Sequence, residues 1–573
     1  MKTSLFLLAF GLCAAMQAQD TATEPIEIFY EGTTATVTIP ASITDVTYIV
    51  NGADVQISSA TTTTEYTYSV SGTSTNGSLL INGQYKMILE LAGVNLTKPN
   101  GGAVIDVECG KRTDLVLKEG TVNTLKDSEF GAQKSALYFK GHAEFKGGGT
   151  LNITGKLKHA ICAKEEIELK SSLGTINVLG AVSDGIHCGR GNITTPEHNY
   201  FQMDGGTVNI TNVGSDGIDS DDYGNTTING GAISINVSAE KSDGIKADSL
   251  LTINDGDINI NVLGRDSEGL ISCYRTTING GNINIIVTAD GSKGIKSKQE
   301  TDQSTVLNGG FLDITGGSID IYVTGNSYLK ANGNTSNCMD ISVDANLTQS
   351  GGDIHLVAMG PETKGMNVKG TNTKTAGTLK VIRGPWLMDP FDLEFGMTAY
   401  VRVYKNGEPV TDYSNLAIGA FVGTECMGIA EFDQAEWGLA RIHYDCTDDD
   451  PVSFKLFDNS IGREFELTAD RDIFFESEGV VGMPSSPVRL DYEMTFTPGD
   501  VNADGFVNIF DAVQVVNYIL GNNPSPFIFE AADMDASNAI NIFDAVSIVN
   551  IILNEGDSTH SVKSRPAFEI DPQ

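Results

Sequence analysis

Near the end of the chain, two twelve-residue runs carry oxygen-bearing side chains at the spacing of a calcium-binding loop. The first has oxygen ligands at loop positions 1, 3, 5, 9 and 12, Gly505 at position 6 and the Phe506 carbonyl at position 7. Its side-chain ligands are Asp500, Asn502, Asp504, Asn508 and Asp511. Because Ca²⁺ takes six to eight hard oxygen ligands, this run predicts a Ca²⁺ site.

The second run begins 33 residues later and repeats the pattern. Its ligands are Asp533, Asp535, Ser537, Asn541 and Asp544, with the Ala539 carbonyl at position 7. Ser537 and Asn538 replace the usual Asp-Gly pair, which weakens the predicted second Ca²⁺ site, although Asn tolerates the left-handed turn.

Each loop leads into one amphipathic helix, expected over 512–520 and 545–553, and no helix precedes either loop. A duplicated loop and helix with Asp at position 12 resembles a type I dockerin, over about 499–556. The resemblance implies a Ca²⁺-dependent fold and docking onto a cohesin domain of a scaffold or surface protein. Positions 10 and 11 depart from the Ser/Thr pair of cellulosomal dockerins, because they are Ile509-Phe510 and Ile542-Phe543. The alternative is a Ca²⁺-stabilised C-terminal cap whose Phe side chains pack inside.

A third oxygen-rich stretch lies in the middle of the chain. Four carboxylates fall within seven residues, namely Asp216, Asp219, Asp221 and Asp222. This density suits Ca²⁺, which also bridges an acidic protein to an acidic sugar chain. A solvated acidic turn is an equal alternative.

Catalysis at this stretch would require a base beside the cation. A Ca²⁺-dependent pectate-lyase-like eliminase acidifies the sugar C5 proton and removes it with Arg or Lys, and the candidates are Arg265, Arg275 and Lys246. No acidic cluster, Arg and Lys fall together at one spacing, so no catalytic residue is assigned. His159 and His187 occupy matching positions on neighbouring repeats and are assigned no function.

These residues belong to a repeat. The segments Thr227–Ile235, Thr252–Ile260 and Thr277–Ile285 recur with a period of 25 residues, and an Asp-Gly-Ile-like motif stands between them. A fixed period of this length predicts a solenoid, and its short runs of Ile, Val and Thr broken by Gly predict strands. Strands that stack on their own copies pair in parallel. We therefore expect a mainly β protein with a right-handed parallel β-helix over 25–383 that begins with a small β cap.

The recurring pattern of glycine and β-branched residues resembles a family of secreted bacterial carbohydrate-binding proteins built on a pectate-lyase-like β-helix. The segments that carry it are Gly148–Ile153, Asp184–Ile186, Gly205–Ile210 and Asp216–Ile218. The resemblance covers about 25–385. It implies Ca²⁺ bound on the solenoid and affinity for plant cell wall polysaccharides. Two kinds of ligand are implied, acidic pectin-type chains such as polygalacturonate, and cellulose.

After the repeat, residues 384–495 read as short alternating strands, which predict a β-sandwich accessory domain of about seven strands. Cys426 and Cys446 are candidates for a bridge between its strands. In the repeat, Cys162 and Cys188 lie about one coil apart and are expected to stack in the core.

The composition bounds the partners and the destination of the chain. With 74 acidic against 37 basic residues, the formal charge is -37, which argues against binding nucleic acid or an anionic membrane. Residues 1–18 read as a secretory signal peptide, no later stretch is apolar for long enough to span a membrane, and 557–573 are expected to be a flexible tail.

These observations favour a secreted or cell-surface, non-catalytic polysaccharide-binding protein attached to a complex through its Ca²⁺-binding tail. Two alternatives remain: a Ca²⁺-dependent polysaccharide lyase, and a purely structural surface or adhesion protein. A lyase would consume polymer and make unsaturated ends, whereas a binding protein would not.

Overall fold

The computed structural model describes residues 24–558 apart from 190–199, 300, 303–304, 307–308, 360–362, 385, 387–394, 414, 435–436, 445–448, 460, 462, 495, 503–504, 523, 525, 536 and 538. The predicted signal peptide, Asp504, Cys446 and nearly all of the predicted tail therefore lie outside the described residues. Within them, no helix is both long enough and apolar enough to cross a bilayer.

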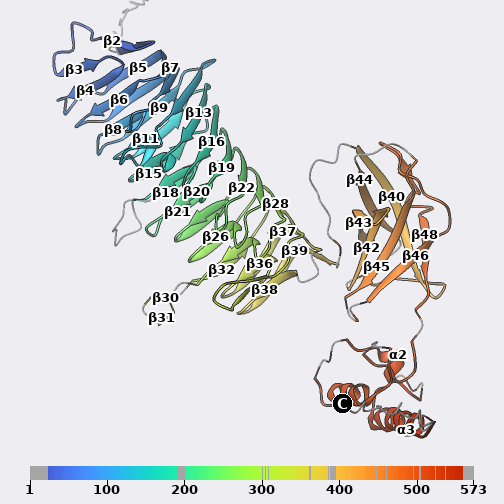
Figure 1. Cartoon of the computed structure of the whole chain (residues 1–573). Coiled ribbons are helices and arrows are strands. Elements are labelled where there is room, and N and C mark those ends of the chain that lie inside the picture. The colour runs from blue at the N-terminus through green and yellow to red at the C-terminus, as the bar shows by residue number, and fades with distance from the viewer. Residues whose placement is uncertain are drawn as a thin grey trace, which may run out of the picture.

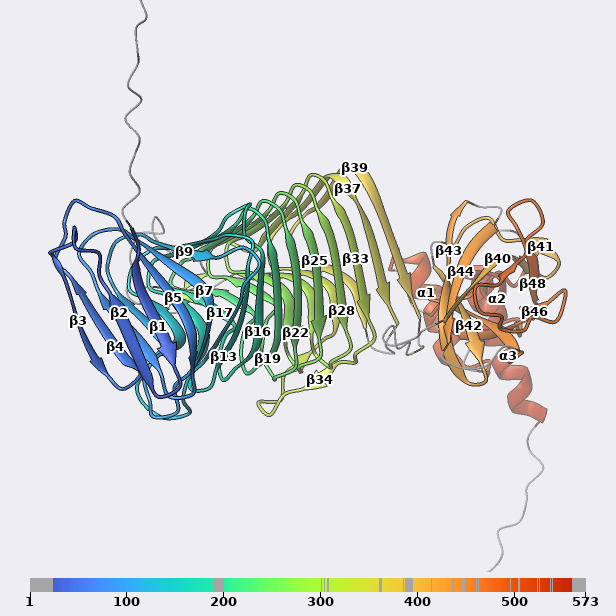
Figure 2. The same cartoon turned by 90° about the horizontal axis from the view of Figure 1, so that it is seen from above.

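The first two thirds of the chain form a parallel β-helix in which each regular coil contributes one short strand to each of three parallel stacks (Figures 1 and 2). This confirms the predicted solenoid. Stack 1 contains β10 (Val122–Lys126), β13 (Thr150–Gly155), β16 (Thr175–Ala181), β19 (Thr207–Val213), β22 (Ala232–Val237), β25 (Asp257–Val262), β28 (Asn282–Val287) and β33 (Ser318–Val323).

Stack 2 contains β4 (Asp54–Ser59), β6 (Ser78–Asn82), β8 (Ile105–Glu108), β11 (Ser135–Phe139), β14 (His159–Ala163), β17 (Ile186–Cys188), β20 (Ile218–Ser220), β23 (Ile245–Ala247), β26 (Glu268–Ser272), β29 (Lys293–Ser297), β36 (Met339–Val343) and β38 (Lys364–Val368). Stack 3 contains β9 (Thr113–Leu117), β12 (Ala143–Lys146), β15 (Glu166–Leu169), β18 (Tyr200–Met203), β21 (Asn225–Ile228), β24 (Leu250–Ile253), β27 (Arg275–Ile278) and β32 (Phe311–Ile314). The longer strands β5 (Tyr66–Ser74), β7 (Met87–Thr97), β37 (Leu347–Ala358) and β39 (Asn372–Arg383) bridge stacks 1 and 3 at the two ends of the solenoid.

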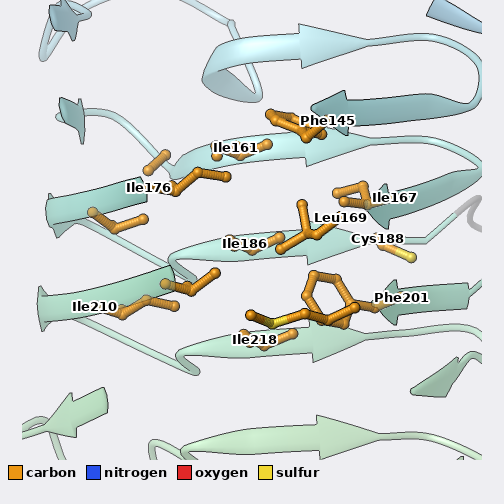
Figure 3. Close-up of a cluster of buried hydrophobic side chains, with 14 of the residues drawn as sticks. Phe145, Ile161, Ile167, Leu169, Ile176, Ile186, Cys188, Phe201, Ile210 and Ile218 are labelled. Atoms are coloured by element: carbon orange, nitrogen blue, oxygen red, sulfur yellow. The ribbon is translucent and has the colours of Figure 1, made fainter. Parts of the chain in front are cut away.

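The alternating pattern of each strand buries one aliphatic ladder per stack. In stack 2, Ile161 pairs in register with Ile186, which pairs with Ile218, and Figure 3 shows these side chains facing those of the other stacks. These side chains are 0–1% exposed. Cys188 lies in this core, but Cys162 does not stack on it, because Cys162 pairs with His187 and packs beside Tyr138 on the outer side.

The ends of the β-helix depart from the simple coil. At the N-terminus, β1 (Ile26–Glu31) pairs antiparallel with β2 (Thr34–Thr38), and β3 (Val46–Asn51) pairs antiparallel with β4. Near the C-terminal end, β32 (Phe311–Ile314) and β33 (Ser318–Val323) continue stacks 3 and 1. Short hairpins, β30 (Thr301–Asp302) with β31 (Thr305–Val306) and β34 (Tyr328–Leu329) with β35 (Thr335–Ser336), interrupt these coils.

The next module is all-β as expected, but its strands form one closed sheet rather than the two sheets of a sandwich. The sheet runs β40-β44-β43-β42-β45-β46-β48 and closes because β48 also pairs with β40. The strands are β40 (Phe395–Lys405), β42 (Leu416–Val422), β43 (Glu425–Gln434), β44 (Trp437–Tyr444), β45 (Val452–Asp458), β46 (Arg463–Ala469) and β48 (Val488–Tyr492), with β41 (Glu408–Pro409) and β47 (Val480–Val481) at its edge. Full closure makes it a small barrel without an unpaired edge.

The C-terminal module is helical. It contains α1 (Ile509–Ile519), α2 (Phe529–Ala532) and α3 (Ile542–Ser558), and its small core joins Val515 of α1 to Ile548 of α3. The helices α1 and α3 begin three residues earlier than the predicted 512 and 545, directly after Asn508 and Asn541.

Candidate functional site

The Asp-Gly-Ile-like motif stands at the start of the stack 2 strands β17, β20, β23, β26 and β29, and its glycine is required by space. A Cβ added to Gly244 would lie 2.5 Å from the carbonyl oxygen of Gly269 and 2.7 Å from Cγ2 of Ile260. The same collision recurs coil after coil, at Gly185, Gly217, Gly269 and Gly294. The motif is therefore first of all a packing signal.

The acid of the motif ties neighbouring coils together. Oδ1 of Asp184 accepts a hydrogen bond from the backbone N–H of Asp216 at 3.2 Å, Asp216 accepts from Asp243 at 2.8 Å, and Asp243 accepts from Glu268 at 2.8 Å. All four acidic side chains are buried. We call this row the acid ladder, since the first three carboxyl groups each satisfy a buried backbone donor of the next coil, while Glu268 pairs with Lys296 at 2.7 Å.

Two histidines join the acid ladder at its N-terminal end. The rings of His159 and His187 stack with centroids 4.2 Å apart. Their Nδ1 atoms lie 2.9 and 3.0 Å from the same oxygen, Oδ2 of Asp184. Nδ1 of His187 also lies 3.0 Å from Oδ2 of Asp219. The prediction that the two histidines occupy matching positions was wrong: His159 aligns with Asp184, two residues before a core Ile, whereas His187 follows Ile186 and pairs with Cys162. Their shared contact with Asp184 was not predicted.

The electrostatics of this group follow from burial and from these contacts. Burial lowers the pKa of His159, whereas hydrogen bonds to Asp184 and Asp219 outweigh burial at His187 and raise its pKa to about 9. Burial disfavours the Asp184 carboxylate, but hydrogen bonds from both histidines hold its pKa well below the ordinary value. Burial, followed by the charge of Asp219, raises the pKa of Asp216 to about 7.

The structure divides the four predicted Ca²⁺ ligands of the solenoid into two pairs. Asp216 and Asp219 are buried, and Asp219 pairs with Lys246 at 3.0 Å. Burial raises the pKa of Asp248 to about 7, and a hydrogen bond shared with Asp221 adds to this rise. The backbone N–H of Asp222 donates to Asp248 at 3.1 Å. A four-carboxylate Ca²⁺ site at Asp216, Asp219, Asp221 and Asp222 stays a prediction.

The three candidate bases of a lyase do not converge. Lys246 lies on β23 beside Asp219, whereas Arg275 lies on β27 in stack 3, paired with Asp313 and 4.7 Å from the Phe311 ring. Arg265 lies in the turn before β26, with its guanidinium 4.6 Å from the Tyr328 ring. Each cation already has a structural partner, and they stand on three separate segments of the coil.

Stack 1 presents a different surface. Among the six strands from β13 to β28, Asp257 is the only charged residue, and the outward positions carry mostly Asn, Thr and Ser. We call these outward side chains the amide face. Nδ2 of Asn177 donates to Oδ1 of Asn152 at 2.9 Å, and Asn209 donates in the same way to Asn177 at 2.9 Å. Such a ladder uses one N–H and one carbonyl lone pair of each internal amide, which leaves one N–H and one lone pair of each for a ligand.

The barrel closes the C-terminal end of the amide face. His355 of β37 and Lys380 of β39 continue the column of outward residues that contains Asn284 and Asp320. The side chains of His355 and Lys380 both lie 3.5 Å from the Glu431 carboxylate of β43. Beside them, Trp386 packs in an apolar cluster that joins Ile382 to Phe421 of the barrel. The barrel thus forms a wall at one end of the face.

In the first C-terminal loop, Asp511 organises the backbone. It is 0% exposed, its Oδ1 accepts the N–H groups of Val501 and Asn502 at 2.8 and 3.1 Å, and its Oδ2 accepts that of Asn508 at 2.8 Å. The Asn508 side chain caps α1 through the Phe510 N–H at 2.9 Å. Gly505 has a φ of +87°, the left-handed turn expected at position 6.

The second loop repeats these contacts. Asp544 is 0% exposed, with Oδ1 accepting from the Met534 N–H and Oδ2 from the Asn541 N–H, both at 2.8 Å. Carboxylate oxygens of Asp533, Asp535 and Asp544 lie within 4.8 Å of one another. This oxygen-only cluster fits Ca²⁺, and Ser537, Asn541 and the Ala539 carbonyl surround it as predicted ligands.

The helices that follow the loops expose a duplicated apolar surface. Phe510 and Phe543 are 68% and 71% exposed, so neither packs inside as the cap interpretation requires. Between α1 and α3 lies a groove of about 360 Å³ lined by Ile509, Ala512, Val513, Val516, Asn517, Ile542, Ala545, Val546 and Val549. We call this groove with the two phenylalanines the docking face.

Comparison with known proteins places these features in context. A family model described as carbohydrate-binding domain-containing protein matches residues 51–290, and a model of the type I dockerin domain matches residues 498–553. Among solved structures, a gadolinium derivative of the polysaccharide lyase-like protein from C. thermocellum is 22% identical, with 43% of this chain and 94% of that chain covered and a TM-score of 0.35. No curated protein matches the chain.

Proposed function

We propose that this chain, which combines a carbohydrate-binding domain with a C-terminal type I dockerin domain, is an exported, non-catalytic protein that holds plant cell wall polysaccharide. The dockerin domain attaches it, in a Ca²⁺-dependent way, to a cohesin-bearing scaffold or surface protein. The polysaccharide lies along the β-helix.

The amide face carries the glycan part of this proposal. A polysaccharide presents neutral hydroxyl groups at regular intervals, and the face offers amide and hydroxyl groups that recur with every coil, about 4.8 Å apart. With a formal charge of -37, the chain repels polyanions, whereas a face with one charged residue in six strands does not penalise a neutral chain. We therefore place cellulosic glycans ahead of pectin-type chains as its ligand.

Retention of the mature full-length chain on insoluble cellulose tests this assignment. Ser234 and Asn259 are exposed neighbours on β22 and β25, and the double variant Ser234→Glu/Asn259→Glu places two charges on the amide face. We expect at least a tenfold loss of retention. The matched control, Thr227→Glu/Thr252→Glu, places the same charges at outward positions of stack 3 in the same coils and should bind as wild type. Equal loss in both variants would remove the amide face from the proposal.

The same preparation distinguishes a lyase from a binding protein. On polygalacturonate with Ca²⁺, the proposal expects no absorbance from unsaturated sugar ends. A rise that EDTA abolishes would overturn it, and Lys246, Arg265 and Arg275 would then be the residues to replace.

The docking face carries the attachment part. Ca²⁺ held by Asp500, Asn502, Asn508 and Asp511, and by Asp533, Asp535 and Asp544, is proposed to fix the two helices against each other. Phe510→Asp/Phe543→Asp should weaken binding to the cohesin partner by at least about 100-fold, because exposed aromatic anchors dominate interface energies. Val480→Asp, an equally exposed apolar side chain in the barrel, is the control. Unchanged binding of the Phe510→Asp/Phe543→Asp variant would leave the module as a structural cap.

A further inference from the structure

We propose that His159, Asp184, His187 and Asp219 bind a divalent transition-metal ion of the Zn²⁺ class on the outer side of stack 2. This site is separate from the amide face and from the dockerin loops, and the proposal holds whether or not the glycan assignment does.

The donor atoms already converge. Both imidazole Nδ1 atoms lie within 3.0 Å of one Asp184 oxygen, and Asp219 adds a second carboxylate 3.0 Å from His187. In a tetrahedral Zn²⁺ site with bonds of about 2.1 Å, neighbouring ligand atoms stand about 3.4 Å apart. The three recorded contacts therefore need to open by a few tenths of an ångström, and the two stacked rings need to turn so that both Nδ1 lone pairs meet at the ion.

The types of donor select the ion. Imidazole nitrogen suits Zn²⁺, Ni²⁺ and Cu²⁺, whereas Ca²⁺ takes oxygen ligands alone. The predicted Ca²⁺ site at Asp216–Asp222 counted only carboxylates, and the structure places the His187 ring nitrogen beside Asp219 and Asp221. The dockerin loops, by contrast, offer oxygen only. The chain therefore carries two chemically distinct kinds of cation site.

The surroundings support a bound cation. Carboxylate oxygens of Asp184, Asp216 and Asp219 lie within 4.8 Å of one another, and each of these side chains is at most 6% exposed. Lys246 is 3.0 Å from Asp219 and 3.8 Å from Asp216 and supplies one positive charge. Metal binding displaces the proton of His187, and the divalent ion then replaces that positive charge beside the three carboxylates.

Among the proposed metal ligands, Asp184 is held in place by hydrogen bonds from neighbouring groups. Oδ1 of Asp184 accepts from the Asp216 N–H at 3.2 Å and from the Ser183 hydroxyl at 3.3 Å, which turns Oδ2 toward the two rings. Such orientation of a ligand by its neighbours is what a metal site requires. When the ion binds, each ring coordinates it through the Nδ1 lone pair and carries its one proton on Nε2, and a second proton on a ring leaves to solvent.

Metal uptake by the mature full-length chain, prepared without a histidine tag and stripped with EDTA, tests the proposal. Equilibrium dialysis against Zn²⁺ in excess Ca²⁺, which occupies the dockerin loops, should show one Zn²⁺ bound per chain. Titration with Co²⁺ should give the visible d–d absorption of a site with nitrogen ligands. Absence of both signals would overturn the proposal and leave a His-Asp-His hydrogen-bond network.

Variants locate the ion. His187→Asn keeps a polar group near the Nδ1 position so that the coil still folds, and it should weaken Zn²⁺ binding at least tenfold, as should His159→Asn. The matched control is His142→Asn on stack 3, where His142 lies 3.1 Å from Glu166 and 3.7 Å from Glu168. Loss of Zn²⁺ in the control but not in the His187 variant would move the site to His142 and refute the assignment.

Discussion

The amide face and the acid ladder lie on the same coils of one β-helix and have opposite chemistry. Both are built on strands that recur with the same period and bury the same aliphatic ladders. Between β13 and β28, stack 1 has one charged outward residue, Asp257, and pairs its Asn side chains amide to amide, whereas stack 2 gathers acids, lysines and histidines. Most acidic side chains of stack 2 accept hydrogen bonds from backbone N–H groups or form ion pairs with neighbouring cations. A high acidic count therefore does not by itself mark the surface that meets the ligand.

The largest expected loss of stability comes from replacing a glycine of the repeat, because this glycine belongs to the backbone that supports both faces. Gly244→Ala should cost about 3 kcal/mol or more, because its Cβ would lie 2.5 Å from a carbonyl oxygen. Gly230→Ala is the control, since its Cβ would come no closer than 3.4 Å to any neighbour. Chemical denaturation of both variants measures the difference. Similar stabilities would mean that the corner relaxes and that the repeat glycine is not a packing signal.

A smaller effect is expected at the acid ladder itself. Asp243→Ala leaves the buried N–H of Glu268 without its acceptor and should cost about 2 kcal/mol. Asp243→Asn keeps an oxygen acceptor. Burial and the charge of Glu268 raise the Asp243 pKa well above its ordinary value, so the neutral amide should be as stable as wild type or more stable at neutral pH. If Asn were as harmful as Ala, the carboxylate charge rather than its hydrogen bond would hold the coils together.

The period made the solenoid predictable, because each strand and turn of a coil is specified by local pattern and repeated. The Asp-Gly-Ile spacing located stack 2, and the twelve-residue pattern located the two loops that lead into α1 and α3. Barrel closure was not predictable: it depends on pairing between β40 and β48, far apart in sequence, and short alternating strands look the same in a sandwich.

The histidine cluster was missed for a different reason. Its members are spread over three coils and two columns, and the residue type changes along each column. His159 and Asp184 stand two residues before Ile161 and Ile186, whereas His187 and Asp219 stand one residue after Ile186 and Ile218. Periodicity identifies the residues that recur from coil to coil, whereas the proposed metal ligands stand at positions where the residue type changes between coils.

A pH effect is expected at the N-terminal end of stack 2. Burial and then the charge of Glu108 raise the pKa of Asp106 from 3.8 to about 6, and its Oδ1 is buried without a hydrogen-bond partner. A raised carboxyl pKa means that stability is fully present below about pH 4 and is lost as the pH rises through 6. Asp106→Asn should therefore stabilise the chain by about 1 kcal/mol at pH 8, allowing for partial exposure, and by almost nothing at pH 4. A gain that does not depend on pH would contradict this origin.

The smallest expected effect on stability lies on the amide face. Asn177→Ala removes two ladder hydrogen bonds, but the side chain is only half-buried and water replaces them, so the cost should be about 0.5 kcal/mol. Cellulose retention should nevertheless fall several-fold, because the amide that meets the glycan is lost. Thermal unfolding and retention measured on one preparation give both numbers. A loss of several kcal/mol with retention unchanged would mean that the amides, like the acids of stack 2, serve the fold, and the contrast between the two faces would then be one of charge alone.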